Sequence, residues 1–136
     1  MRNYNDYSHG RSVGWNEYHF QWCTKYRYKI FRNLKYKNFC KILIEESCKR
    51  YSINLIEYEV DSNHIHLLVS LPLTMTPIEA ISKIKGYTSK CLFILCPKLR
   101  SLYHRGHLWS SGKFIASVDH ITLSKAKEYI EKHEFK

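Results

Sequence analysis

The amino-acid sequence predicts an α+β fold in which two helices cover one face of an antiparallel sheet, with a further helix added at the C-terminus. Short segments with alternating apolar and polar residues are typical of strands, and two longer segments carry apolar residues at helical spacing. These elements follow one another in the order β-α-β-β-α-β-α. A chain of 136 residues suits one domain with a substantial core. We therefore expect a single domain over residues 1–136, with residues 1–12 as a flexible N-terminus.

The first half of the chain predicts two strands that flank a helix. Val13–Thr24 alternates as a strand does, and its two faces differ in polarity. One face carries Tyr18, Phe20 and Trp22, and the other carries Glu17, His19 and Gln21. Asn38–Tyr51 has helical spacing, with Phe39, Ile42 and Leu43 in its apolar stripe. Ile53–Val60 is then expected as the second strand.

The second half completes the sheet. A turn at Asp61-Ser62-Asn63 leads into a strand over His64–Leu71, so this strand and the one before it form a hairpin. Thr76-Pro77-Ile78-Glu79 predicts a capped helix start, and the helix stops before Pro97. The residues expected to face inward from this helix are Ile78, Ile81, Ile84 and Leu92.

A short strand near Phe114–Val118 and a terminal helix within residues 120–136 follow, the latter capped by Thr122 or Ser124 and ending near His133. The first six elements match the split βαβ, ferredoxin-like arrangement. This order leaves one sheet face open, and the terminal helix is a candidate to cover it.

Charge and composition narrow the classes of partner. The chain has 22 Lys plus Arg against 12 Asp plus Glu, so its net charge of +10 favours a polyanion such as nucleic acid. The longest apolar run, Cys91–Cys96, is far too short to span a bilayer, and the N-terminus lacks the apolar core of a secretory signal. The five cysteines form no C-x-x-C pair, so we expect buried structural thiols and a cytoplasmic protein.

The positive charge is concentrated in two acid-free segments. Lys25–Lys37 carries six basic residues, and Ala80–Val118 carries seven. Tyr26, Tyr28, Tyr87, Tyr103 and Trp109 are interleaved with these basic residues. Basic side chains neutralise phosphates and aromatic rings stack on unpaired bases, so the combination favours single-stranded or hairpin nucleic acid.

Two sets of residues are candidates for chemistry. His64 and His66 share one face of their strand, about 7 Å apart at their Cα atoms, and can converge on one metal ion or be ordinary surface histidines. Tyr129 and His133 are four residues apart and lie on one face of the terminal helix, where the tyrosine can also simply pack.

Five blocks over about residues 14–133 resemble the single-tyrosine HUH transposases of insertion sequences, including the REP-associated tyrosine transposases. Tyr18–Arg27 resembles the first strand with its T-K-Y-R ending, and Asp61–Val69 resembles D-x-x-H-U-H-L-L-V, where U is a bulky apolar residue. The others are Ile84–Ser89 for K-G-x-[ST]-S, Leu108–Ala116 for the W-S and F-x-A stretch, and Tyr129–His133 for Y-I-x-x-Q. This sequence has His133 where the family usually has Gln, which can shift metal preference toward softer ions such as Mn²⁺.

The resemblance implies that the protein cuts and rejoins single-stranded DNA at hairpin-bearing element ends. Tyr129 would attack the scissile phosphate and form a 5′-phosphotyrosine. His64, His66 and His133 would hold Mg²⁺ or Mn²⁺. The residues expected to contact DNA are Lys25, Arg27, Lys85, Arg100 and Arg105. The family also implies a homodimer, with the tyrosine often acting on the partner's histidine pair.

Two other functions fit parts of the sequence. A non-catalytic domain that binds single-stranded or hairpin nucleic acid could use Tyr18, Phe20 and Trp22 as a stacking platform, although this does not account for the histidine pair together with Tyr129 and His133. A metal-dependent hydrolase could use the histidine pair to activate water, and it would leave no protein–DNA adduct.

Overall fold

The structure is a computed structural model that describes residues 15–118. The strands are β1 (Trp15–Cys23), β2 (Asn54–Val60), β3 (His64–Pro72) and β4 (Phe114–Val118). The main helices are α1 (Leu34–Arg50) and α2 (Pro77–Leu95), and short 3-10 helices cover Lys25–Arg27, Ile30–Arg32 and Pro97–Ser101. The expected terminal helix, with Tyr129 and His133, lies outside the described residues.

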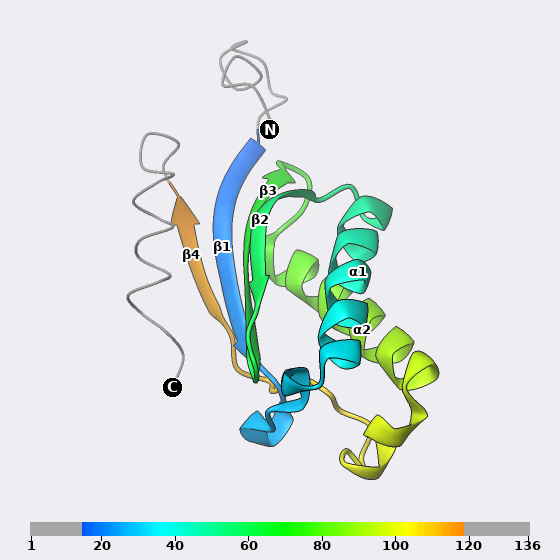
Figure 1. Cartoon of the computed structure of the whole chain (residues 1–136). Helices are drawn as coiled ribbons and strands as arrows, with labels where there is room; N and C mark the ends of the chain where they lie inside the picture. The colour runs from blue at the N-terminus through cyan, green and yellow to red at the C-terminus, as the bar shows by residue number, and fades with distance from the viewer. Residues whose placement is uncertain (1–14, 119–136) are drawn as a thin grey trace.

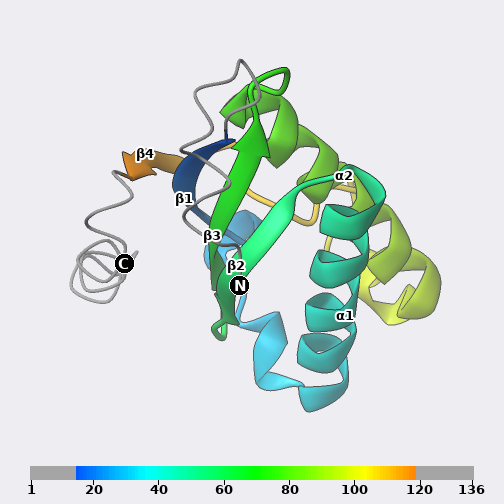
Figure 2. The same cartoon turned by 90° about the horizontal axis from the view of Figure 1, so that it is seen from above.

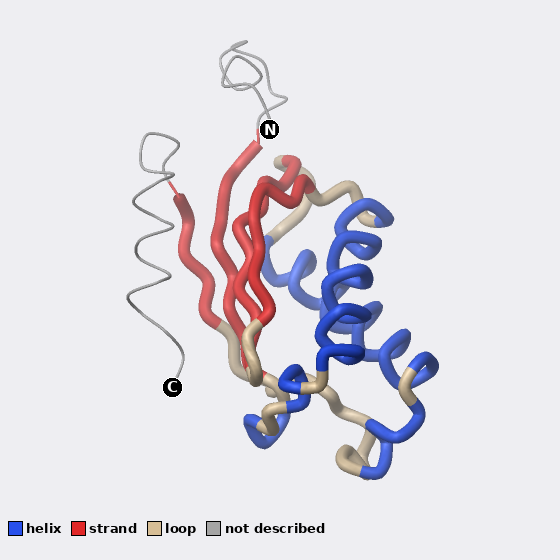
Figure 3. The backbone as a smooth tube through the Cα atoms, in the orientation of Figure 1, coloured by secondary structure: helices blue, strands red, loops and turns tan. Residues whose placement is uncertain are grey.

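The four strands form one sheet in the order β2-β3-β1-β4, and every neighbouring pair is antiparallel. Helices α1 and α2 lie on the same side of this sheet (Figure 1). Figure 2 shows the sheet from above, with both helices beyond one face, and Figure 3 shows the same separation of strands from helices. The predicted α+β, ferredoxin-like arrangement is confirmed for these elements.

The core lies between the helices and one face of the sheet. Phe20 and Trp22 from β1 and Ile65 and Leu67 from β3 are completely buried in one cluster with apolar residues of both helices. Because successive strand residues point to opposite faces, this burial places His64 and His66 on the face turned away from the helices. It also corrects one expectation, since Phe20 and Trp22 are core residues and cannot serve as a stacking platform for bases.

The helix starts follow from capping. Helix α1 begins at Leu34, earlier than the expected Asn38, because the side chain of Asn33 accepts a hydrogen bond from the backbone N–H of Tyr36 at 3.2 Å. The predicted capping box of Thr76 and Glu79 is confirmed at the start of α2.

Two predicted inward-facing residues are in fact exposed. Ile42 of α1 is 52% exposed and Ile78 of α2 is 62% exposed, whereas Ile81, Ile84 and Leu92 are buried. The two errors have different causes: Ile78 lies in the first turn of α2, at the edge of its buried face, whereas Ile42 lies on the side of α1 opposite the buried Ile44.

All five cysteines are free thiols, and all except the half-buried Cys91 are buried. Burial raises the pKa of the Cys48 thiol to about 12, as expected for a structural thiol that stays protonated. Within residues 15–118, no helix has both the length and the apolar character to cross a membrane.

Candidate metal centre and nucleic-acid interface

The histidine pair lies where β3 begins, beside the end of β1. His64 pairs with Cys23 and His66 pairs with Gln21 across the antiparallel ladder. The two imidazole rings lie nearly parallel, with centroids 6.0 Å apart. Both side chains are largely but not completely buried, with 11% and 16% of their surface exposed. The sheet therefore presents two imidazoles side by side on the face turned away from α1 and α2.

The β2–β3 turn brings a carboxylate to both histidines. Asp61 Oδ2 lies 3.1 Å from His64 Nε2 and 3.3 Å from His66 Nε2. The turn is closed by a backbone hydrogen bond from the Asp61 N–H to the His64 carbonyl at 2.8 Å. Glu59 reaches only one ring, with Oε1 3.3 Å from His66 Nε2, and its side chain is 65% exposed. Asp61 is thus the shared acidic neighbour of the pair.

Asn63 determines which nitrogen of His64 is turned toward this carboxylate. Its side-chain Oδ1 lies 2.9 Å from His64 Nδ1. Since an amide oxygen only accepts hydrogen bonds, this contact favours a proton on Nδ1, which in a neutral ring leaves the lone pair on Nε2. This is the arrangement in which an imidazole can bind a metal ion through Nε2.

Asp61, His64 and His66 can hold a divalent metal ion. Their potential ligand atoms all lie within 4.8 Å of one another. Two imidazole nitrogens and one carboxylate oxygen are a donor set that suits ions such as Mn²⁺, and a carboxylate also suits Mg²⁺. Sequence reasoning found the two histidines but not Asp61 as a ligand. The motif D-x-x-H already placed this carboxylate three residues before His64, in a tight turn, and that position could have indicated Asp61 as a ligand.

The neighbouring position on β1 adds a third imidazole to this face. His19 is buried, and its ring stacks on Phe114 of β4 with centroids 5.6 Å apart. Burial lowers the pKa of His19, and the nearby His66 lowers it further. Both effects favour the neutral form of His19.

The two acid-free basic segments meet at the end of β1. The backbone N–H of Lys25 donates to the carbonyl of Leu108 at 2.7 Å, and Thr24 pairs with Trp109 in an isolated bridge. The ring of Tyr26 stacks on that of Tyr103 with centroids 6.3 Å apart. These contacts bring the turn that holds Lys25 and Arg27 against the loop that holds Arg100 and Arg105. The two segments therefore form one basic region.

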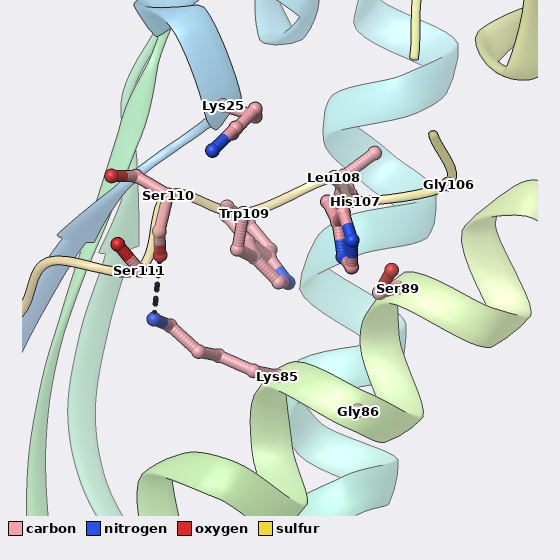
Figure 4. Close-up of a pocket in the computed structure, with 10 residues that line it drawn as sticks. All are labelled: Lys25, Lys85, Gly86, Ser89, Gly106, His107, Leu108, Trp109, Ser110 and Ser111. Carbon is pink, nitrogen blue, oxygen red and sulfur yellow. Dashed lines mark hydrogen bonds between the residues drawn. The ribbon is translucent and has the colours of Figure 1, made fainter. Parts of the chain in front are cut away.

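A cavity of about 380 Å³ lies between this loop and α2 (Figure 4). Its lining residues are Lys25, Lys85, Gly86, Ser89, Gly106, His107, Leu108, Trp109, Ser110 and Ser111. The ammonium group of Lys85 donates to the Ser110 carbonyl at 2.7 Å, and the indole N–H of Trp109 donates to the buried Thr88 hydroxyl at 2.9 Å. The K-G-x-[ST]-S and W-S segments are thus bonded to each other.

Lys85 lies on the helix side of the sheet, away from the histidine pair. Its ammonium group is 5.6 Å from the ring centre of Trp22, whose side chain is in the core. Burial lowers the pKa of Lys85 to about 8, and the charge of Lys113 contributes to this shift. A contact between Lys85 and DNA would therefore occur on a different surface from the one that carries the metal ligands.

Comparison with known proteins shows one consistent similarity. The family model described as "Transposase IS200 like" matches residues 12–133. The ISDra2 transposase TnpA of Deinococcus radiodurans is 27% identical over 115 residues, which is 85% of this chain and 81% of that protein. The IS200 transposase of Salmonella typhimurium is 29% identical over 121 residues, covering 88% of this chain and 78% of that one.

Two solved structures share the fold. The crystal structure of a candidate transposase from Deinococcus radiodurans R1 superposes with a TM-score of 0.73 over the full length of both chains, at 23% identity. A REP-associated tyrosine transposase bound to a REP hairpin superposes with a TM-score of 0.59 at 10% identity, covering 85% of this chain and 62% of that one.

Proposed function

The chain belongs to the IS200-like transposase family, and on that basis we propose that it cuts and rejoins single-stranded DNA at hairpin-bearing element ends through a 5′-phosphotyrosine intermediate. The observation that carries this proposal is the convergence of Asp61, His64 and His66 at one end of β3. A purely structural sheet has no need of two imidazoles aimed at one carboxylate, whereas metal-assisted phosphoryl chemistry does.

The proposed metal ligands are Asp61, His64 and His66, with His133 from the terminal segment as a further ligand. A bound Mg²⁺ or Mn²⁺ would supply Lewis-acid polarisation of the phosphoryl oxygens. The neighbouring residues have supporting roles. Asn63 would keep Nε2 of His64 turned toward a bound ion through its contact with Nδ1, and the carboxylate of Asp61, as a ligand, would also offset part of the ion's charge.

Tyr129 is the proposed nucleophile. Its phenolic oxygen, after losing the proton, forms a bond to the scissile phosphorus, and the bond from phosphorus to the 3′ oxygen breaks. That oxygen takes up a proton and leaves as a 3′-hydroxyl. A second 3′-hydroxyl then attacks the phosphotyrosine and releases the phenol. The phosphodiester energy is conserved at each step, so joining requires no ATP.

The basic region is the proposed contact surface for the DNA backbone. Lys25 and Arg27 lie in the turn directly after β1, beside the end of β3 that carries the histidines. Arg100 lies in the adjoining 3-10 helix Pro97–Ser101, and Arg105 lies in the loop that follows it. Lys85 would contact a part of the strand that passes over the helix side. A protein of the same fold is bound to a REP hairpin, and this supports hairpin DNA as the partner. We also propose that the reaction takes place in the cytoplasm.

The decisive experiment uses a labelled single-stranded hairpin with Mg²⁺ or Mn²⁺ and asks for a denaturant-resistant protein–DNA adduct. We expect an adduct with the wild-type protein and none with Tyr129→Phe. Cleavage without an adduct would indicate a hydrolase, and binding without cleavage a non-catalytic binding domain. His64→Ala should abolish cleavage while hairpin affinity changes by no more than a few fold. An adduct that persists in Tyr129→Phe would remove this tyrosine from its role.

We further propose a homodimer in which each Tyr129 serves the partner's histidine pair. Light scattering of the full chain gives the mass directly, and the mass of one chain would overturn the dimer. Mixing Tyr129→Phe with His64→Ala separates the two arrangements. Adduct formation recovered by the mixture requires the tyrosine to act in trans.

A further inference from the structure

Two exposed tyrosines in the turn after β1 pack on a third tyrosine that is buried. Tyr26 is 58% exposed and Tyr28 is 42% exposed, while Tyr103 beneath them is 1% exposed. The ring of Tyr26 is stacked on Tyr103 at an interplanar angle of 10°, and that of Tyr28 lies 5.6 Å from Tyr103. We call Tyr26 and Tyr28 the tyrosine platform. Its rings are supported from within by a buried ring and remain accessible from outside.

The turn that carries the platform is held in an unfavourable backbone conformation. Tyr26 and Arg27 have φ values of 61° and 55°, a region that favours glycine. The hydroxyl of Thr24 donates to the Tyr28 carbonyl at 2.7 Å, and the Arg27 N–H donates to the Thr24 carbonyl at 3.0 Å. Such strain persists where the surroundings enforce it, and it is concentrated at ligand-binding sites. The two rings are therefore positioned before any ligand arrives.

The platform is joined to the metal ligands through Asn63. The backbone N–H of Thr24 donates to the Asn63 carbonyl at 2.9 Å, and the Asn63 side chain bonds to His64. The same residue therefore contacts the turn of the platform and orients a metal-binding imidazole.

The charge around the platform defines the class of ligand. The ammonium group of Lys25 lies 5.6 Å from the centre of the Tyr26 ring, and Arg27 follows in the chain. Neither acid-free segment that meets here contributes a carboxylate. A ligand that matches exposed rings bordered by positive charge has a flat face and adjoining negative groups. An unpaired nucleotide in a single strand has both.

We propose that Tyr26 and Tyr28 stack on an unpaired base close to the scissile phosphate, while Lys25 and Arg27 contact the phosphates on either side. The inference rests on the proposed function, because it places that base in the strand to be cut. It assigns to this turn the positioning of the single-stranded segment. Stacking accepts any base, so the platform would set the path of the strand and contribute little to sequence selection.

The test uses hairpin substrates that carry 2-aminopurine at successive single-stranded positions. The protein is the full chain with Tyr129→Phe, so that binding is measured without cleavage. We expect fluorescence quenching at one position or two adjacent ones, lost in Tyr26→Leu and retained in Tyr26→Phe. Affinity should fall about tenfold in Tyr26→Leu. Tyr26→Leu removes the aromatic ring, and Tyr26→Phe, which keeps the ring at the same exposed position, is its matched control. Thermal melts of both variants check that the fold is intact.

Salt dependence separates stacking from charge. Tyr26→Leu should weaken binding at every salt concentration without changing the slope of log K against log salt, whereas Lys25→Gln should reduce that slope by about 0.7. An abasic site at the quenched position should weaken wild-type binding and have little further effect in Tyr26→Leu. If the abasic site and Tyr26→Leu each weaken binding independently, so that their losses in binding free energy add, the proposal is wrong.

The outcomes also separate this inference from the proposed function. If the wild-type protein forms the Tyr129 adduct while Tyr26→Leu and Tyr28→Leu quench and bind like their parent, the platform is wrong and the function stands. If quenching depends on the rings but the wild-type protein forms no adduct, the function is wrong and the stacking site stands.

Discussion

The side-chain oxygen of Asn63 lies 2.9 Å from Nδ1 of His64, and this contact determines the direction in which the imidazole offers its other nitrogen. Nε2 of His64 and Nε2 of His66 then face the same oxygen of Asp61, at 3.1 and 3.3 Å. A residue that binds no metal itself therefore controls the geometry of the candidate metal centre.

Replacing Asn63 with alanine should weaken metal binding without removing a ligand. Loss of the Nδ1 partner frees the ring to rotate and to change tautomer, and such partners typically contribute 10- to 100-fold in affinity, so we expect a loss of roughly that size. Calorimetric titration with Mn²⁺ measures it. Ser62→Ala, in the same turn, is the control and should bind like wild type. Unchanged Mn²⁺ affinity in Asn63→Ala would contradict the orienting role.

Asp61 and Glu59 should differ in their effect on the metal. Asp61 faces both imidazoles, whereas Glu59 reaches only His66 from an exposed position. We expect Asp61→Asn to lower Mn²⁺ affinity by about tenfold or more, since it removes a charged ligand, and Glu59→Gln to lower it by less. Electron paramagnetic resonance of bound Mn²⁺ reports both the affinity and the change in ligands. An equal loss of Mn²⁺ affinity in both variants would mean that the two carboxylates act through their negative charge alone and that Asp61 is not a direct ligand.

The hydrogen bond from Trp109 to Thr88 should contribute measurably to stability. The indole N–H donates to the Thr88 hydroxyl at 2.9 Å, and that hydroxyl donates to the Ile84 carbonyl at 2.7 Å. Thr88→Val leaves a buried donor without a partner, which should lower the free energy of unfolding by about 1–3 kcal/mol. Urea unfolding measures the change. Thr88→Ser keeps the hydroxyl and loses only a methyl group, so it should cost less than Thr88→Val. The reverse order would assign the effect to packing.

Lys85 should make stability rise with pH in alkaline solution. Its pKa is lowered from 10.5 in the unfolded chain to about 8 in the folded one. Between these values the unfolded state binds more protons, so the free energy of unfolding increases as pH rises from about 8 to 10.5. Other groups titrate in the same window, so the measurement is the difference between wild type and Lys85→Met in urea unfolding at pH 8, 9 and 10.

The lowered pKa of Lys85 predicts the direction in which the difference in unfolding free energy between the two proteins changes with pH. Below pH 8 both states of the wild-type protein hold the proton, and the cost of burying the charge is present in full. Above pH 8 the free energy of unfolding of the wild-type protein should therefore rise relative to that of Lys85→Met, so the value for Lys85→Met minus the value for wild type should fall steadily. A difference in unfolding free energy that stays constant from pH 8 to 10 would mean that Lys85 keeps an ordinary pKa in the folded protein.

Local patterns were sufficient for most of the elements. The alternation in Val13–Thr24 and His64–Leu71 predicted which residues share a face, because that period is a property of any strand. The capping box at Thr76 predicted the start of α2 for a similarly local reason. The start of α1 was missed because Asn33 follows a basic stretch with no helical period, so its capping role becomes evident only with the helix in place.

The candidate site divides along the same line. By itself the sequence determined the order of the main strands and helices within residues 15–118, the shared face of His64 and His66, and the two acid-free basic segments, because these are consequences of spacing along the chain. Only the tertiary structure decided that Phe20 and Trp22 are core residues, that Asp61 lies between the two histidines, and that Tyr26 stacks on Tyr103. Those contacts depend on which sheet face the helices cover and on the pairing of segments far apart in sequence, and no local period contains that information.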